Sequence, residues 1–203
     1  MNSPNHVMVL GASGHFGSVI FEALFEQLPT IEWHLLGRRN QWQSKEKIHF
    51  HQFDYCKDKD LPTFQNQPKI LLDLTGPIKS QDGIVQKLCF KTGIIYVDMA
   101  VHYSHLKTVK EIYGSFGKGV CISHTGFFPG LTNLMLNECL KQCGPEAEYH
   151  LKTIWPIYAG GGKHVANTLI DLLNDAQGHY FLKNGKRIPI KMHGENQKIM
   201  MDP

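Results

Sequence analysis

The chain lacks any apolar run of about 18 residues, and no basic segment followed by an apolar stretch opens it in the manner of a signal peptide. We therefore expect neither a membrane span nor a secretory signal. A strong net charge is also missing, because the 203 residues carry a formal charge of only +3, with lysine and arginine scattered along the chain. This balance gives no indication of a nucleic-acid partner.

Clustered cysteines and matched sets of metal ligands are missing as well. The five cysteines form no Cys-x-x-Cys pair, so we interpret them as reduced thiols of a cytoplasmic protein. His49 and His51 share one face of a predicted strand, and His102 and His105 share one face of a predicted helix. Neither pair has a matching third ligand in the sequence, and no metal site is predicted. The Gly-x-Ser-x-Gly motif of serine hydrolases is absent.

The most informative segment that is present is Gly11-Ala12-Ser13-Gly14-His15-Phe16-Gly17. An apolar strand-like run precedes it and a helical pattern follows it, which is the order of a dinucleotide-binding turn. The start of such a helix directs free N–H groups and the positive end of its dipole at a phosphate. Gly11 permits the tight turn, Gly14 the approach of a pyrophosphate, and Gly17 close packing of helix on strand. The alternative is a flexible loop, which the flanking strand and helix disfavour.

Apolar runs alternate with helical patterns as far as residue 143. The predicted strands are 6–10, 32–36, 47–53, 69–74, 94–98 and 119–123, and the predicted helices are 15–28, 79–92, 101–113 and 130–142. This alternation with short connections predicts an α/β fold, a Rossmann-type doubly wound parallel sheet. We assign residues 1–143 to this NAD(P)-binding domain.

The sequence pattern changes near Gly144-Pro145. Residues 148–157 predict a long strand, residues 165–176 an amphipathic helix, and residues 180–190 a hairpin around the tight turn Asn184-Gly185. Residues 144–203 are therefore expected to be the start of a second, incomplete α/β domain. Open strand edges and half-covered apolar faces favour association. We expect a homodimer in which a second copy covers 148–157 and 180–190.

The residues after the second predicted strand indicate which cofactor is bound. NAD-specific folds carry an acidic residue there that bonds the ribose 2′-hydroxyl, whereas this chain has Arg38 and Arg39. A guanidinium group matches a 2′-phosphate in shape and charge, so the pair predicts NADP. A solvated surface pair is the alternative. Asp54, after the third strand, either bonds the adenine amino group or caps a turn.

Polar residues also follow the later strands. The loop Thr75-Gly76-Pro77 is expected to pass under the pyrophosphate and the nicotinamide ribose. Asp98 and His124 end the fifth and sixth strands, near the expected position of the nicotinamide. Histidine titrates near neutral pH, so His124 is the candidate general acid/base, with Asp98 orienting the substrate or the loop. A helix N-cap role for Asp98 and a structural loop role for His124 are the alternatives.

A second-domain site is expected beside the Gly160-Gly161-Gly162 loop. Lys163 and His164 follow these glycines directly, and we expect them to bind a carboxylate of a small-molecule substrate. A positive side chain next to a glycine loop suits that task.

Six segments in order resemble the NADP-binding region of saccharopine dehydrogenase-like proteins: GASGHFG, LLGRRN, DLTGP, KTGIIYVDMA, HTGFFPGLTN and GGGKHVANT. The resemblance implies a Rossmann domain followed by an α/β domain with a mixed sheet, and nicotinamide-dependent redox chemistry at a carbon–nitrogen bond. It implies that Gly11, Ser13, Gly14, Phe16, Arg38, Thr75 and Gly76 line the cofactor. Typical members have a longer second domain, so the chain looks C-terminally incomplete.

These features together predict an NADP-dependent oxidoreductase that transfers hydride at a C–N or C=O centre of a small substrate. The alternative is an NADP-binding sensor or scaffold without turnover. A third possibility is an atypical short-chain reductase acting on a carbonyl.

Overall fold

The computed structural model describes residues 6–39, 42, 46–76, 83–100, 103–116, 119–126, 130–142, 180–183 and 186–189. The chain divides into two compact units, Met1–His150 and Leu151–Pro203. The domain boundary expected after residue 143 lies outside the described residues. No helix in the described ranges combines the length and apolar content needed to cross a membrane.

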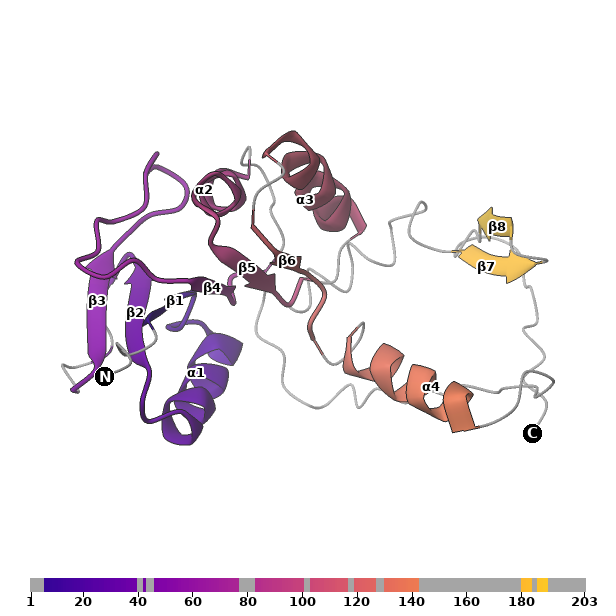
Figure 1. Ribbon diagram of the computed structural model, residues 1–203, viewed down its shortest axis with the longest axis horizontal. Coiled ribbons are helices and arrows are strands. Elements are labelled where there is room, and N and C mark those ends of the chain that lie inside the picture. Colours follow the sequence, from indigo (N-terminus) through magenta and orange to yellow (C-terminus); the bar gives the residue numbers. More distant parts are fainter. Residues whose placement is uncertain are drawn as a thin grey trace. The chain divides into compact units, whose positions relative to one another are not determined.

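The first unit contains a six-stranded parallel sheet in the order β3-β2-β1-β4-β5-β6 (Figure 1). This is the strand order of the dinucleotide-binding Rossmann fold, so the predicted fold class is confirmed. The chain runs outward from β1 to β3 and then returns to the other side of β1 to form β4. The topological switch point therefore lies between β1 and β4. The strands are β1 (His6–Leu10), β2 (Glu32–Gly37), β3 (Ile48–Gln52), β4 (Ile70–Asp73), β5 (Ile95–Asp98) and β6 (Cys121–Ile122).

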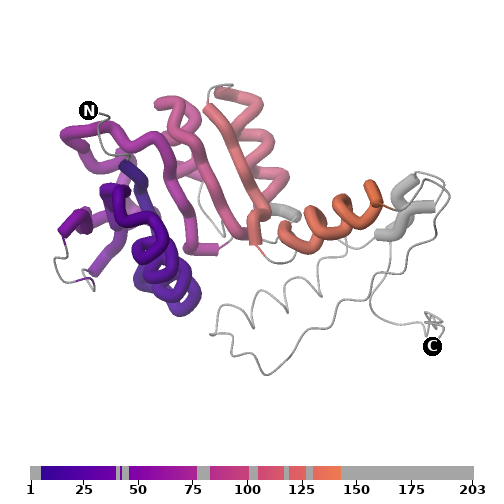
Figure 2. Tube along the Cα trace, turned by 60° about the horizontal axis from the view of Figure 1, so that its bottom comes forward, coloured from indigo at the N-terminus to yellow at the C-terminus, as the bar shows by residue number. Residues whose placement is uncertain are grey.

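Helices cover both faces of this sheet, with α1 on one side and α2 and α3 on the other (Figures 1 and 2). On the α1 face, Phe21 packs edge-on against Trp33, with ring centroids 5.4 Å apart. On the opposite face, Phe90 and Tyr96 lie fully buried among aliphatic side chains of β1, β4 and α3. The helices are α1 (His15–Gln27), α2 (Ile84–Thr92), α3 (Tyr103–Phe116) and α4 (Leu131–Gln142).

The structure confirms every predicted strand of the sheet, but it corrects two helix boundaries. The expected start of α2 at residue 79 is wrong, because Gly83 has a left-handed backbone (φ 61°) and α2 begins at Ile84. A β-carbon at Gly83 would lie 2.2 Å from Cδ1 of Ile112, so the site is also too close to α3 for a side chain. The end of α3 at residue 113 is likewise wrong, since the helix continues to Phe116.

The second unit is described only where it forms a hairpin. Strands β7 (Tyr180–Lys183) and β8 (Lys186–Pro189) pair antiparallel, with Lys183 opposite Lys186. This register leaves two residues for the connection and confirms the predicted hairpin. The strand expected at 148–157 and the helix expected at 165–176 lie outside the described residues. The homodimer stays a prediction, because no side chain of 148–157 or 180–190 is described.

Close packing of α1 on the first turn depends on Gly17. A β-carbon at this position would lie 2.0 Å from the carbonyl oxygen of Gly11. That oxygen also accepts a hydrogen bond from the backbone N–H of Gly14 at 2.9 Å, which closes the turn. The third glycine of the motif therefore allows the helix to approach the strand, as expected from its spacing.

We predict that Gly17→Ala destabilises the chain by about 1–3 kcal/mol, because the added methyl group forces the turn and α1 apart. The matched control is Gly114→Ala on α3, where no atom lies within 4 Å of the added carbon. The control should be neutral or stabilising by up to about 1 kcal/mol, because alanine favours helix. Urea unfolding of both variants provides the measurement. Equal effects at the two positions would contradict this packing.

Four histidines lie together on the first three strands of the sheet. His34 Nε2 lies 3.0 Å from His6 Nδ1, and His34 Nδ1 lies 2.9 Å from His51 Nε2. The ring of His49 stacks on that of His34 at 5.1 Å. Burial lowers the pKa of His34 to about 4, helped by the charges of His51, His49 and His6, while Glu32 opposes the shift. Within the described ranges, no three His, Cys, Asp or Glu side chains are placed to hold a metal ion.

The lowered pKa of His34 predicts acid-sensitive folding. Between pH 6.5 and pH 4, His34 is protonated in the unfolded chain but stays neutral in the folded chain. The free energy of unfolding is therefore retained above pH 6.5 and falls as the pH drops toward 4. We expect a loss of roughly 1–3 kcal/mol, from about 1.4 kcal/mol per pKa unit less an allowance for solvent screening. We expect the free energy of unfolding, measured with denaturant across this pH range, to depend less steeply on pH in His34→Gln than in the unaltered chain. The same slope in both proteins would rule out His34 as the origin.

Candidate cofactor and reaction site

The loops after β1 and β4 meet at the switch point of the sheet. The backbone N–H of Leu74 donates to the carbonyl of Leu10 at 2.8 Å, which keeps the two strands paired to their ends. A β-carbon at Gly11 would lie 3.0 Å from the backbone nitrogen of Thr75. The glycine turn and the Thr75 loop, predicted separately to bind cofactor, are therefore in direct contact. Ligands of open α/β sheets bind at this position.

The start of α1 is suited to an anion. Gly14 is the N-cap residue, no side chain caps the helix, and its first turn contains no acidic residue. Ser13, Gly14, His15 and Phe16 are all exposed. The first backbone N–H groups of a helix have no partner within the helix, and the helix dipole is positive there. These residues fit a pyrophosphate.

Arg38 and Arg39 follow β2 and are exposed. Burial raises the pKa of Tyr55, which follows β3, and the positive charge of Arg38 opposes that shift. No acidic side chain stands at the end of β2, where an NAD-specific fold would place one. The two exposed guanidinium groups after β2 fit a 2′-phosphate.

Asp54 has its side chain engaged in a turn. Its Oδ1 accepts a hydrogen bond from the backbone N–H of Cys56 at 3.0 Å. Its carbonyl accepts from the N–H groups of Lys57 and Asp58, each at 2.8 Å. This geometry supports the turn-capping alternative, and the adenine contact stays a prediction.

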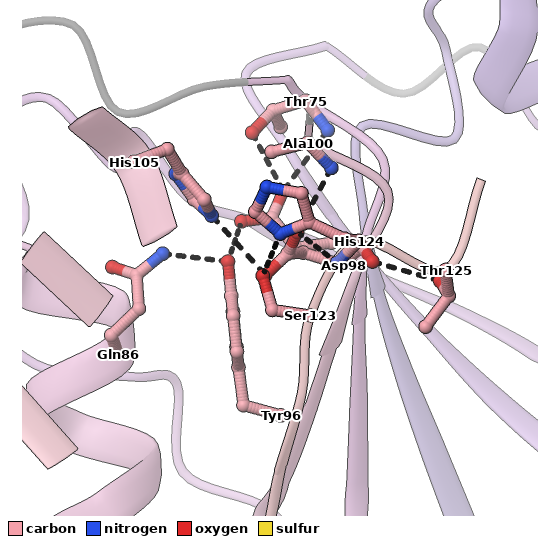
Figure 3. Close-up of polar contacts among 10 residues, drawn as sticks. Thr75, Gln86, Tyr96, Asp98, Ala100, His105, Ser123, His124 and Thr125 are labelled. Carbon is pink, nitrogen blue, oxygen red and sulfur yellow. Dashed lines mark hydrogen bonds and ion pairs between the residues drawn. The ribbon is translucent and has the colours of Figure 1, made fainter. Parts of the chain in front are cut away.

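Asp73, at the end of β4, is 5% exposed and fully hydrogen-bonded. Its Oδ1 accepts from the backbone N–H and the hydroxyl of Thr75 at 3.0 and 2.6 Å. Its Oδ2 accepts a hydrogen bond from the Tyr96 hydroxyl at 2.9 Å. The same hydroxyl oxygen accepts a hydrogen bond from the Gln86 amide at 2.7 Å (Figure 3). Because the Thr75 proton goes to Asp73, the exposed Thr75 oxygen is left to accept from a ligand donor such as a ribose hydroxyl. Burial raises the pKa of Asp73.

Asp98, the last residue of β5, lies opposite Asp73 of β4 and is 2% exposed. Its side chain contacts the loop after β5, the loop after β6 and helix α3. Its Oδ1 accepts from the backbone N–H of Ala100 at 2.8 Å and of His124 at 3.4 Å. Its Oδ2 faces Nε2 of His105 on α3 at 3.2 Å (Figure 3). Burial by itself would raise the Asp98 pKa, but the neighbouring His105 and Ser123 side chains favour its charged form and hold that pKa below its usual value. The carboxylate is therefore ionised inside the protein.

The N-cap alternative for Asp98 is wrong, because α3 begins at Tyr103 and Asp98 bonds Ala100 instead. Its backbone carbonyl accepts from the N–H and hydroxyl of Thr125 at 3.0 and 2.8 Å. Asp98 therefore ties the loop after β5 to the loop after β6. The role of Asp98 in orienting the substrate or the loop stays a prediction.

His124 follows β6 with a left-handed backbone (φ 63°), which is rare for a residue with a side chain. Its Nδ1 lies 3.0 Å from the hydroxyl oxygen of Ser123. Its ring centroid is 6.4 Å from that of His105. The imidazole is half-buried at the same sheet edge as Thr75 and Asp98.

The family model described as the saccharopine dehydrogenase NADP binding domain matches residues 7–122. The chain belongs to this family. The resemblance expected from the motifs is thus confirmed, and the family match supports a nicotinamide dinucleotide as the cofactor. The matched region includes the glycine turn, Arg38 and the Thr75 loop, and it ends two residues before His124.

No curated protein matches the chain. Among solved structures, the chain is similar to UDP-N-acetylglucosamine 4-epimerase from Bacillus cereus, with 16% identity and a TM-score of 0.34. That match covers 58% of this chain and 58% of the epimerase chain.

Several residues of this family member's site were not expected from its sequence. Gln86, Tyr96, Asp73, His105 and Ser123 had no assigned role. The alternation of side chains along the strands could have indicated that the two carboxylates are buried. Asp73 lies on the same face of its strand as buried Leu71, and Asp98 on the same face as buried Tyr96. A carboxylate on the buried face of a strand requires donors. Pro77, Lys163 and His164 lie outside the described residues.

We predict that Tyr96→Phe destabilises the chain by about 1–3 kcal/mol, because it leaves Asp73 Oδ2 and the Gln86 amide unpaired in the core while keeping the ring. The matched control is Tyr113→Phe, which removes a half-exposed hydroxyl that donates to the Gly119 carbonyl at 3.2 Å. The control should cost well under about 1 kcal/mol, since water replaces that bond. Thermal unfolding compares the two. Similar losses would show that the Asp73 network contributes no more than a surface bond.

Proposed function

We propose that the chain is a cytoplasmic NADP-dependent oxidoreductase that transfers hydride at a C–N or C=O centre of a small substrate. The match to a family of NADP-binding domains supports a nicotinamide dinucleotide as the cofactor. The described cysteines Cys56, Cys89, Cys121 and Cys139 are free thiols, which agrees with a reducing compartment.

The observation that carries the proposal is the order of the groups along the sheet edge. Arg38 follows β2, the uncapped start of α1 follows β1 and Thr75 follows β4, while Asp98 ends β5 and His124 follows β6. The parts of NADP come in the same sequence: 2′-phosphate, pyrophosphate, nicotinamide ribose and nicotinamide. Neighbouring strands in the order β2-β1-β4-β5-β6 thus offer a matching group for each successive part of the cofactor.

The bound cofactor would supply or accept the hydride at its nicotinamide. The chain's own residues would position it and handle the proton. Thr75, fixed by Asp73, accepts a hydrogen bond from the ribose. His124 exchanges a proton with the substrate nitrogen or oxygen, and Asp98 holds the two loops that carry this chemistry. Lys163 and His164 remain our candidates for a substrate carboxylate.

The cofactor preference tests this proposal. NADPH should bind more tightly than NADH, and Arg38→Ala should weaken NADPH binding by about tenfold to a hundredfold, as expected for loss of a charge-assisted phosphate contact of roughly 1.5–3 kcal/mol. NADH affinity should stay within about twofold. Lys110→Ala, which removes one exposed positive charge from α3, is the matched control and should bind both cofactors normally. Calorimetric titration of the unaltered chain and the two variants with both cofactors gives the six affinities.

Equal affinities for NADPH and NADH in the unaltered chain would overturn the NADP assignment. Arg39→Ala in the same titration tells whether the second arginine contributes. If NADPH binds with the expected preference and no imine, amino acid or carbonyl compound turns it over, the chain is an NADP-binding sensor or scaffold instead.

A further inference from the structure

We propose that Tyr96 is a positioning residue of the cofactor site, because its buried hydroxyl holds the Asp73 carboxylate in the state that turns the Thr75 proton inward. Thr75 then offers only lone pairs to a ligand. The part of the ligand that lies there must bring a hydrogen-bond donor, as a ribose hydroxyl does and an ionised phosphate does not. The ligand part of this inference rests on the function proposed above, whereas the proton arrangement does not.

Four side chains form one hydrogen-bonded chain from helix α2 to the loop after β4. The Gln86 amide nitrogen donates to the Tyr96 hydroxyl at 2.7 Å, and that hydroxyl donates to Asp73 Oδ2 at 2.9 Å (Figure 3). Asp73 Oδ1 accepts from the Thr75 hydroxyl at 2.6 Å and from the Thr75 backbone N–H at 3.0 Å. The first three residues are buried, and Thr75 is exposed. The chain therefore carries a core constraint out to the candidate cofactor site.

The protons along this chain have a single direction. An amide nitrogen only donates, so the Tyr96 oxygen accepts from Gln86 and the Tyr96 proton is left for Asp73 Oδ2. The backbone N–H of Thr75 also only donates. An ionised carboxylate accepts all the hydrogen bonds that reach Asp73, including the one from the Thr75 hydroxyl. A proton on Oδ2 would reverse the chain, because Tyr96 would then accept from Asp73 and the amide oxygen of Gln86 would have to face Tyr96.

The position of Thr75 directs its oxygen to a defined part of the cofactor. A β-carbon at Gly11 would lie 3.0 Å from Cγ2 of Thr75, so the methyl group of Thr75 lies beside the glycine turn. The pyrophosphate is proposed at the start of α1, directly after this turn. The next part of the dinucleotide is the nicotinamide ribose, whose hydroxyl groups are donors. An acceptor at Thr75 suits this ribose and disfavours a phosphate at the same place.

Tyr96 acts on Thr75 through the charge state of Asp73. Burial raises the pKa of Asp73 and the charge of Asp98 adds to this, while the hydrogen bonds from Thr75 and Tyr96 lower it. Loss of the Tyr96 hydroxyl therefore favours the neutral acid. A proton on Oδ1 would then be donated to the Thr75 oxygen, and the Thr75 proton would turn outward. Thr75 would lose the acceptor role that the ribose requires.

The test compares two ligands by calorimetric titration. NADPH contains the nicotinamide ribose, whereas adenosine 2′,5′-bisphosphate carries the same 2′-phosphate and ends at the first phosphate of the pyrophosphate. Tyr96→Phe and Thr75→Val should each weaken NADPH binding by about threefold to tenfold, as expected for one neutral hydrogen bond. Both should bind the bisphosphate within about twofold of the unaltered chain. The double variant should lose no more than Thr75→Val alone, because the two residues act in series.

Two further variants complete the comparison. Thr75→Ser keeps the hydroxyl and should lose less NADPH affinity than Thr75→Val. Tyr113→Phe removes a hydroxyl that donates to the Gly119 carbonyl, and it should bind both ligands normally. Equal weakening of both ligands by Tyr96→Phe would overturn the positioning role, since that result shows only a general loss of structure. Unchanged NADPH binding in Tyr96→Phe, or additive losses in the double variant, would overturn it as well.

A second measurement needs neither a ligand nor a variant that folds. The ¹³C signal of the Asp73 carboxyl carbon, assigned through the backbone, should be that of a carboxylate at pH 7. A neutral acid at pH 7 would overturn the proton arrangement. A chain that fails to bind NADPH would refute the proposed function together with the ligand role of Thr75, and the carboxylate result would stand. A chain that binds NADPH without turnover would refute only the oxidoreductase activity.

Discussion

The arrangement of the sheet edge depends on two buried carboxylates that stand side by side. Asp73 and Asp98 are register partners at the ends of β4 and β5, and both are almost fully removed from solvent. A buried carboxylate is very costly unless it is hydrogen-bonded. Each carboxylate therefore accepts hydrogen bonds from residues of the neighbouring loops, and these bonds fix the conformation of the loops. Thr75, Ala100 and His124 are held in this way, and Thr125 is held by the backbone carbonyl of Asp98.

The two carboxylates have different surroundings, which shift their pKa values in opposite directions. Burial raises the pKa of Asp73, which has only neutral donors in Thr75 and Tyr96. The pKa of Asp98 is lowered because His105 and Ser123 favour its charged form. Environments that separate the pKa values of neighbouring acids are typical of sites that move protons. In our proposal, Asp73 orients the cofactor loop and Asp98 supports the proton-carrying histidine.

Much of this fold was predictable from the sequence, because local patterns determine it. The glycine turn, the alternation of strands and helices, and the hairpin after residue 180 follow from periodicity and turn residues. The start of α2 was not predictable, since Gly83 takes a left-handed backbone where it meets Ile112 of α3, a tertiary contact. The places of the candidate cofactor residues after β1, β2 and β4 were predictable because the ends of strands can be recognised in the sequence. His105 and Ser123 were not, because their importance comes from a carboxylate that lies near them only in the folded chain.

The central claim is that the groups along the edge match NADP part by part, from Arg38 after β2 to His124 after β6. A crystal structure of the chain with bound NADPH tests it most directly. The claim predicts the 2′-phosphate at Arg38, the pyrophosphate on the first N–H groups of α1, and the nicotinamide beside His124. A dinucleotide bound in the opposite direction, with its nicotinamide at Arg38, or bound away from the Gly14 turn, would contradict it.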